Sequence, residues 1–254
     1  MNDKPKVILE IPIFNPQAGF DIVKNYYETD NRSQLINIAQ KSECDILGLK
    51  FNVTSLEDVP VAVELLFEFL SQIHKPLMIR GSGNDEIDNI LLPALIELLE
   101  RPCIVAFADE NTYKQITPGV IKGGHKLVIR TPIDINLAKE MNILTTDLGL
   151  SLENIIIDTD IGGLGYGLEY GYSIMEKIGL EKDDEYLNLP MISFAAEEAL
   201  KTKEAKADVY DNSYGDLTKR AVMYELAALM AVKAAGASYL VVNYPPNVKV
   251  LKGV

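Results

Sequence analysis

Short apolar runs alternate with amphipathic helical patterns along the whole chain, and this alternation limits the possible folds more than any other feature. The runs have the length and β-branched composition of strands, and we expect strands at 7–13, 45–52, 76–83, 103–108, 126–131, 154–158, 189–194 and 239–244. Helical patterns lie near 32–42, 59–73, 86–100, 112–122, 134–148, 168–178, 197–204 and 217–235. Runs such as LVVNY and IIID are apolar without alternation, which is typical of a parallel sheet covered on both faces. We therefore expect an α/β protein, a (β/α)8 TIM barrel forming a single domain over residues 1–254. A doubly wound open sheet has a similar strand count and remains the competing architecture.

Composition excludes several classes of function. The net charge of -13 argues against a nucleic-acid partner, because phosphate contacts require clustered Lys and Arg. The only cysteines, Cys44 and Cys103, are too few and too far apart for an iron–sulfur cluster or a four-thiolate zinc site. The chain opens without a basic, then apolar leader, and no apolar run approaches the roughly 20 residues of a membrane span. We expect a cytoplasmic protein with no membrane partner.

The segment 155–178, IIIDTDIGGLGYGLEYGYSIMEKI, concentrates the most unusual local pattern. Three isoleucines end in Asp158 and Asp160, and glycines at 162, 163, 165, 167 and 171 follow, interleaved with tyrosines, with helical spacing beginning after Gly167. Glycine lets the backbone approach a ligand or partner closely, because no Cβ intervenes. One glycine would be enough for a tight turn, so five favour close approach to a ligand or partner.

Polar residues gather where the expected strands end, which is where barrels of this type bind ligands. They are Asn15, Asn52, Ser82, Asn84, Asp109, Asn111, Thr131, Asp134, Asn136, Asp158, Asp160, Ser193 and Asn243. Each one alone fits a turn or helix cap. Together they form a rim rich in Asp and Asn and poor in Lys, which suits amide-like and guanidine-like edges such as a pterin or a corrin amide.

Familiar nucleotide motifs are absent from the sequence. The glycine cluster departs from GxGxxG, since Leu168 stands where the third glycine should fall. The GSG at 81–83 lacks the Lys-Ser/Thr of a P-loop.

Catalytic groups of the common kinds are also scarce. Both histidines, His74 and His125, precede strand starts on the opposite face of the expected barrel, so a Ser–His–Asp hydrolase is disfavoured. Lys50 is the one in-strand candidate for a nucleophilic lysine, with snorkelling or an ion pair as the alternatives. Arg80 and Arg130 occupy matching places in their strands, and ion pairing is the simplest expectation for both.

Several segments resemble one known family. TPIDINLAKEMNILTTDLGL (131–150), the glycine segment 155–178, LPMI (189–192) and YGDLTKR (214–220) are similar to the small subunit of the corrinoid iron–sulfur protein. Its archaeal equivalent is the delta subunit of acetyl-CoA decarbonylase/synthase, also called CO dehydrogenase/acetyl-CoA synthase. GSGN (81–84) and DENTYKQI (109–116) fit more loosely.

The resemblance implies a (β/α)8 barrel with a role in the anaerobic reductive acetyl-CoA (Wood–Ljungdahl) pathway. In that family a cobalamin-type corrinoid accepts a methyl group from a methyl-tetrahydropterin and passes it to the synthase. The small subunit pairs with a larger subunit that carries both the iron–sulfur cluster and the corrinoid, and its barrel mouth covers the corrinoid. No iron–sulfur cluster is then expected on this chain, and no metal ligands are assigned to it.

The chain departs from the family pattern on the expected cofactor face. Asp158-Thr159-Asp160-Ile161-Gly162 replaces the usual DPTTG, Tyr214 replaces a usual Trp, and SFAAEEAL (193–200) replaces a Gly-containing turn. The chain is also shorter than typical members, so we expect a short, divergent one.

The leading hypothesis is a corrinoid-handling subunit of a methyl-transfer complex, heterodimeric with a larger corrinoid/iron–sulfur subunit or another corrinoid protein, and not catalytic alone. The residues expected to face the corrinoid are Thr131, Asp134, Asn136, Asp158, Gly162, Gly163, Gly165, Tyr166 and Gly167. One alternative is a stand-alone methyltransferase that binds methyl-tetrahydropterin through Asp134, Asn136 and Asp158. Another is a scaffold that has lost cofactor contact and keeps a partner surface anchored by Tyr166 and Tyr170.

Overall fold

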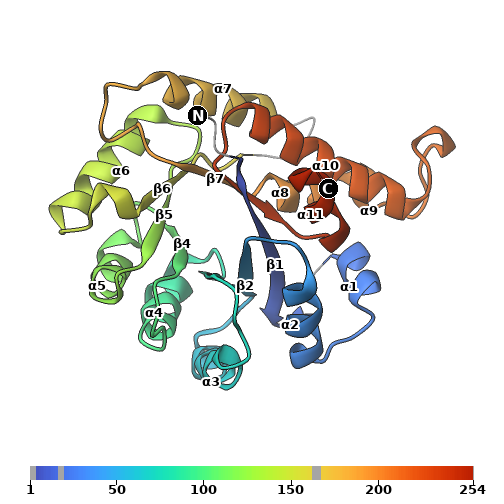
Figure 1. The fold of residues 1–254 in the computed structure, drawn as a ribbon, viewed down its shortest axis with the longest axis horizontal. Coiled ribbons are helices and arrows are strands. Elements are labelled where there is room, and N and C mark those ends of the chain that lie inside the picture. Colours follow the sequence, from blue (N-terminus) through green and yellow to red (C-terminus); the bar gives the residue numbers. More distant parts are fainter. Residues whose placement is uncertain (1–3, 17–19, 162–166, 254) are drawn as a thin grey trace.

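The chain folds into a closed barrel of eight parallel strands, with helices arranged around it (Figure 1). The computed structural model describes residues 4–16, 20–161 and 167–253. Each strand pairs with the next along the chain, and the last pairs with the first. The strands are β1 (Lys6–Phe14), β2 (Ile46–Phe51), β3 (Leu77–Arg80), β4 (Ile104–Ala108), β5 (Lys126–Arg130), β6 (Ile155–Asp158), β7 (Met191–Ser193) and β8 (Tyr239–Val242). The expected (β/α)8 barrel is confirmed, and the open sheet is excluded.

Helices follow the strands and cover the outside of the barrel. They are α1 (Asp21–Tyr27), α2 (Arg32–Lys41), α3 (Val59–Leu70), α4 (Asp85–Ile96), α5 (Tyr113–Gly123), α6 (Ile135–Asp147), α7 (Leu168–Leu180), α8 (Ala195–Lys201), α9 (Lys203–Lys206), α10 (Leu217–Ala234) and α11 (Pro245–Lys252). Short 3-10 turns lie at Leu56–Asp58, Leu152–Asn154 and Asn212–Tyr214. None of the helices in the described parts of the chain combines the length and apolar character needed to cross a membrane.

The strand sequences explain why both faces of the sheet are buried. Successive strand side chains point to opposite faces, so one set packs under the helices and the other fills the barrel. Leu47 and Leu49 of β2 belong to the core between sheet and helices. Ile46 on the same strand belongs to a second apolar cluster with Ile8 and Met78. A strand buried on both sides must be apolar throughout, as these sequences are.

Asx residues between strands and helices cap the helices. The side chains of Asn31, Asn84, Asp134 and Asp216 accept hydrogen bonds from backbone N–H groups in the first turns of α2, α4, α6 and α10. These bonds satisfy amides that have no partner within the helix. Asn84 and Asp134 follow strands β3 and β5 directly and belong to the predicted Asx-rich rim, so capping accounts for part of that rim.

Two helices were not expected from the sequence, and one expected helix is divided into two. Helices α1 and α11 have 7 and 8 residues, too short to show a clear period, and α11 begins with Pro245 and Pro246. The pattern near 197–204 forms two short helices, α8 and α9, separated at Thr202, whose backbone is extended.

Candidate functional site

Ionisable side chains enter the barrel interior at the carboxyl ends of its strands. The lower interior is apolar, and Ile8, Ile46, Met78, Val128 and Ile156 belong to one cluster there. Two positions further along their strands stand Glu10, Arg80, Arg130 and Asp158, and Lys50 lies four positions beyond Ile46. Strand pairing aligns Lys50 with Arg80, and Arg130 with Asp158, so charged residues face one another at the same level of the mouth.

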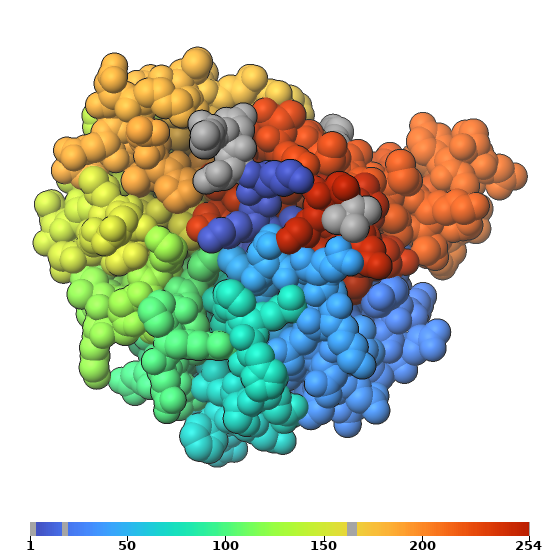
Figure 2. Space-filling view, in the orientation of Figure 1, coloured from blue at the N-terminus to red at the C-terminus, as the bar shows by residue number. Residues whose placement is uncertain are grey.

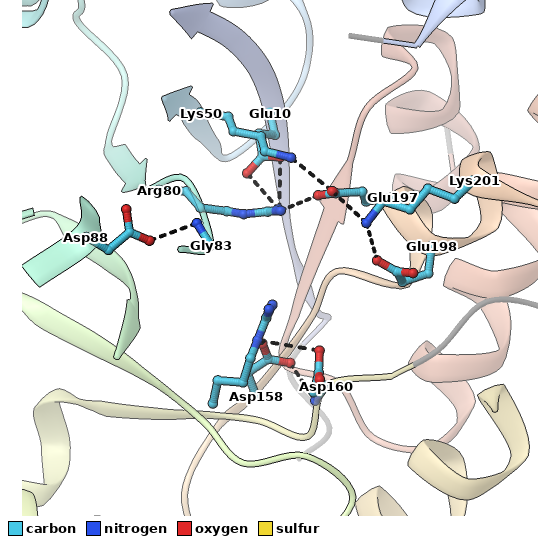
Figure 3. A network of polar contacts seen from close by, with 11 residues as sticks. Glu10, Lys50, Arg80, Gly83, Asp88, Asp158, Asp160, Glu197, Glu198 and Lys201 are labelled. Atoms are coloured by element: carbon cyan, nitrogen blue, oxygen red, sulfur yellow. Dashed lines mark hydrogen bonds and ion pairs between the residues drawn. The ribbon is translucent and has the colours of Figure 1, made fainter. Parts of the chain in front are cut away.

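Glu197, from helix α8, joins three cations in this mouth (Figure 3). Its carboxylate accepts from Lys50 Nζ at 2.9 Å, pairs with Lys201 Nζ at 3.0 Å and contacts Arg80 Nη2. Arg80 also reaches Glu10 at 3.1 Å. Glu10 and Glu197 are 1% and 7% exposed, so both carboxylates are withdrawn from solvent. It ties α8 to β1, β2 and β3.

The pKa values of the two buried glutamates are shifted in opposite directions, because the balance between burial and neighbouring charge differs. Burial raises the pKa of Glu10, and the attraction of Arg80 does not fully offset that effect. Burial would also raise the pKa of Glu197, but Arg80, Lys50 and Lys201 hold it well below its usual value. Burial and the nearby Arg80 lower the pKa of Lys50, with Glu197 opposing them. Glu197 is therefore the firmly ionised centre of the cluster.

A second cluster lies around Arg130. Its Nε donates to Asp158 Oδ2 at 2.7 Å and lies 3.5 Å from Asp160 Oδ1. The second oxygen of Asp158 accepts the backbone N–H of Asp160 at 3.0 Å. The guanidinium stacks 3.4 Å from the ring centre of Phe107 and 5.5 Å from that of Phe194. Arg130 is thus fixed by two acids and two aromatic rings.

Among the described residues, two small spaces lie at the mouth beside these clusters. One cavity of about 210 Å³ is lined by Arg80, Arg130, Asp158, Glu197 and neighbouring residues. A second, of about 120 Å³, is lined in part by Glu10, Lys50 and Asn243. Lys50, Glu197 and Lys201 line both, so their ion pairs form the wall between them. Cofactor pockets usually measure roughly 300–1,000 Å³.

The loop after β3 is shaped by one buried carboxylate. Asp88 of α4 accepts the backbone N–H groups of Ser82 and Gly83 at 2.7 and 2.8 Å, and the second of these bonds is drawn in Figure 3. A Cβ on Gly81 would lie 2.5 Å from Asp88 Oδ1, so glycine is required there. Burial raises the pKa of Asp88 even though these hydrogen bonds oppose the rise. The GSGN segment is accordingly a clamped turn at the edge of the mouth.

The predicted site residues occupy different environments. Thr131 and Asp158 are buried and adjacent, since the Thr131 N–H donates to the Asp158 backbone carbonyl at 2.9 Å. Asp134 and Asn136 are exposed at the start of α6, where Asp134 caps the helix. Gly167 precedes α7 with φ of 109°, a conformation that favours glycine. The other four predicted residues, Gly162, Gly163, Gly165 and Tyr166, lie outside the described residues.

The ion pairs expected for Lys50, Arg80 and Arg130 are confirmed. Sequence reasoning missed Glu10 and Glu197, the partners of Arg80 and Lys50. It also expected a rim poor in lysine, whereas Lys50 and Lys201 both line the mouth. A usable signal was present, because ILEIPI, LGLKF and LMIR each carry one charge in an apolar strand. An isolated charge buried inside a barrel requires a partner across it.

These features define a (β/α)8 barrel whose carboxyl-end mouth is filled by its own ion pairs. The chain belongs to the CO dehydrogenase/acetyl-CoA synthase delta subunit family, whose model matches residues 20–237. It is 29% identical over 197 residues to the acetyl-CoA decarbonylase/synthase complex subunit delta of Methanocaldococcus jannaschii, covering 76% of this chain and 48% of the relative. The corresponding subunit of Archaeoglobus fulgidus is 29% identical over 249 residues, covering 91% and 55%. The chain spans about half the length of these curated relatives.

Solved structures share the architecture at low sequence identity. The dihydropteroate synthase of Xanthomonas albilineans, in complex with 7,8-dihydropteroate, superposes with a TM-score of 0.65 and 12% identity, covering 100% of this chain and 94% of that one. The dihydropteroate synthase of Thermus thermophilus gives a TM-score of 0.62, also at 12% identity, covering 100% and 96%. This likeness concerns the fold.

Proposed function

We propose that this chain is a corrinoid-handling subunit of a methyl-transfer complex, in which its barrel mouth covers a cobalamin-type corrinoid carried by a partner subunit. Family membership supplies the class of complex, since the curated relatives are subunits named for acetyl-CoA decarbonylase/synthase. In this proposal residues 1–254 act as one barrel domain, the partner is a larger corrinoid/iron–sulfur subunit, and the methyl group comes from a methyl-tetrahydropterin.

The small volume of the two spaces at the mouth is the observation that supports a cofactor shared with a partner. The spaces of about 210 and 120 Å³ lie below the range of pockets that enclose a whole cofactor. Enlarging them would require breaking the buried contacts of Glu197 with Lys50 and Arg80. A corrinoid would therefore rest across the rim, where a second protein can hold its other face.

The rim residues have the chemistry that a corrin periphery needs. Asp134 and Asn136 are exposed at the start of α6 and can accept from or donate to amide side chains. Thr131 Oγ1 and Asn243 Oδ1 are buried without a hydrogen-bond partner among the described residues, which fits a polar ligand nearby. When bound, the corrinoid supplies the cobalt that carries the methyl group. This chain would orient it and exclude water.

A stand-alone pterin-binding methyltransferase is the main competitor. It would use Asp158, yet both carboxylate oxygens of Asp158 already have partners in Arg130 and the Asp160 N–H. A pterin edge would first have to displace Arg130 from its stacking on Phe107. Calorimetric titration of the chain with methyl-tetrahydrofolate separates the two, because heat from the chain alone would favour the pterin enzyme.

Two alanine variants on one helix test where the corrinoid lies. Asn136 is in the first turn of α6, nearest the mouth, and Glu140 lies one turn further away. Asn136→Ala should weaken cobalamin retention by the chain with its corrinoid subunit about five- to tenfold, the loss of roughly one hydrogen bond. Glu140→Ala should leave retention unchanged. Equal effects of the two variants would contradict placement of the corrinoid on the rim.

A further inference from the structure

The guanidinium of Arg130 is held at one nitrogen and along one face, and its two terminal nitrogens are free. Its Nε donates to Asp158 at 2.7 Å and lies 3.5 Å from Asp160, while its plane stacks 3.4 Å from the ring centre of Phe107. Among the described residues, neither Nη1 nor Nη2 of Arg130 has a hydrogen-bond partner. A guanidinium has five N–H donors, and four of them are on these terminal nitrogens. Arg130 therefore presents an unused edge of donors in a fixed orientation.

This free edge belongs to the wall of a cavity. Arg130 lines the mouth cavity of about 210 Å³, and 18% of its side chain is exposed. Figure 3 shows Glu197 and Lys201 on one side of this space and Asp160 on the other. Figure 2 shows the molecule from the end where the N-terminal residues, in dark blue, lie, and side chains pack over the centre of the barrel there. A ligand would therefore enter from the other end, at the carboxyl ends of the strands.

A second arginine in the same wall also has a donor without an acceptor. Arg80 is 6% exposed, and its terminal nitrogens reach Glu10 and Glu197. Its Nε is buried without a hydrogen-bond partner among the described residues. Arg80 and Arg130 lie 4.5 and 5.5 Å from the ring centre of Phe194, so the two guanidinium groups are neighbours at one ring. Buried N–H groups normally have acceptors, and an oxygen atom between the two arginines would supply one.

The lining of the cavity indicates which kind of oxygen it would accept. Equal numbers of cationic and acidic side chains line it, so a doubly charged anion would meet strong repulsion. A carboxylate has a single charge, and its two oxygens match the two terminal nitrogens of an arginine. Phe107 and Phe194, 8% and 5% exposed, line the same space and suit a short hydrocarbon chain. The ligand must be small, because pockets for drug-sized molecules measure roughly 300–1,000 Å³.

We propose that this cavity binds a small monocarboxylate, whose two oxygens accept from Nη1 and Nη2 of Arg130 and whose hydrocarbon part lies beside Phe194. The site is preorganised, because Asp158 and Phe107 hold Arg130 in place before a ligand arrives. The proposal does not rest on the corrinoid function. The exposed rim residues assigned to the corrinoid, Asp134 and Asn136, do not line this cavity.

NMR titration of the whole chain with butyrate, at constant ionic strength, tests the proposal. Butyrate should bind with a dissociation constant of about 1 mM, as expected for a well-placed ligand of this size. Butyramide has the same shape without the charge and should bind at least about tenfold more weakly. Equal binding of the two, or no binding of butyrate up to about 50 mM, would overturn the proposal.

Two further ligands test the chemical class and the place of binding. Inorganic phosphate should bind more weakly than butyrate, because Asp158, Asp160 and Glu198 line the same cavity. Tighter binding of phosphate would overturn the assignment of a carboxylate. Adamantane-carboxylate is too bulky for the cavity and should not bind. Binding as tight as that of butyrate would mean that an arginine on the surface is responsible, and it would overturn the cavity site.

Matched arginine variants test the role of Arg130. Arg130→Lys keeps a positive charge beside Asp158 but loses the planar pair of donors, so butyrate should bind at least about tenfold more weakly. Arg101→Lys makes the same change at the opposite end of the barrel, where Arg101 donates to backbone carbonyls before β3, and should leave binding unchanged. Equal effects would overturn the assignment. The wild-type comparison of butyrate with butyramide decides the question if a variant does not fold.

Discussion

At the scale of single residues, Glu225 shows how a buried carboxyl can hold a loop in place. It is fully buried on α10 and accepts the backbone N–H groups of Asn243 and Tyr244 at 2.6 and 3.0 Å. It also accepts from the Asn247 side chain at 2.6 Å. Burial raises its pKa to about 7, since three hydrogen bonds only partly offset the loss of water. The loop between β8 and α11 is therefore fixed by a group that titrates near neutrality.

Glu225 should make stability depend on pH. Because its pKa rises on folding from 4.5 to about 7, the stability it contributes is complete below pH 4.5 and is lost as pH rises to 7. We expect Glu225→Gln, which cannot ionise, to gain on the order of 3 kcal/mol relative to wild type between pH 4.5 and pH 7. Urea unfolding of both proteins across this range measures the difference. Parallel pH profiles would contradict the assignment.

At the scale of elements, helix α8 is held over the mouth by Glu197. Three cations share this carboxylate, and α8 otherwise packs mainly against α10 and α9. The adjacent Glu198 pairs with Lys201 at 2.6 Å, but its side chain is 36% exposed. The two neighbours thus allow a buried and a surface ion pair to be compared within one helix.

Alanine substitution should separate these two glutamates. Glu197→Ala leaves Lys50 and Arg80 near each other without their shared counter-charge, so a loss of about 3–5 kcal/mol in unfolding free energy is expected. Glu198→Ala should cost only about 0–1 kcal/mol, because water screens its ion pair. Urea denaturation at pH 7 measures both. Similar losses would mean that the buried network does not anchor α8.

The elements were largely predictable from sequence, whereas their charged contacts were not. All eight strands lie where apolar runs indicated, because a strand buried on both faces must be apolar whatever its neighbours. The pairing of Arg80 with Glu10 and Glu197 depends on barrel closure and on where α8 lies, which are properties of the assembled fold. Among the predicted site residues, Thr131 and Asp158 do meet, because consecutive strands β5 and β6 are neighbours.

At the scale of the whole molecule, the barrel mouth is the surface that the proposed function assigns to a partner. The mouth offers exposed polar residues such as Asp134 and Asn136 around a centre that is filled by buried ion pairs. In the proposed function the barrel acts as a cover, with its own mouth filled by ion pairs.

Gel filtration with visible absorbance tests this account most directly. The chain would be mixed with hydroxocobalamin, alone and together with a corrinoid/iron–sulfur subunit, and corrin absorbance would be followed in the protein peaks. The proposed function predicts that corrin elutes with this chain only when the partner is present, because the spaces that the described residues leave at the mouth are too small to enclose the cofactor. Corrin retained by the chain alone, or a partner that holds its corrin without binding this chain, would contradict it.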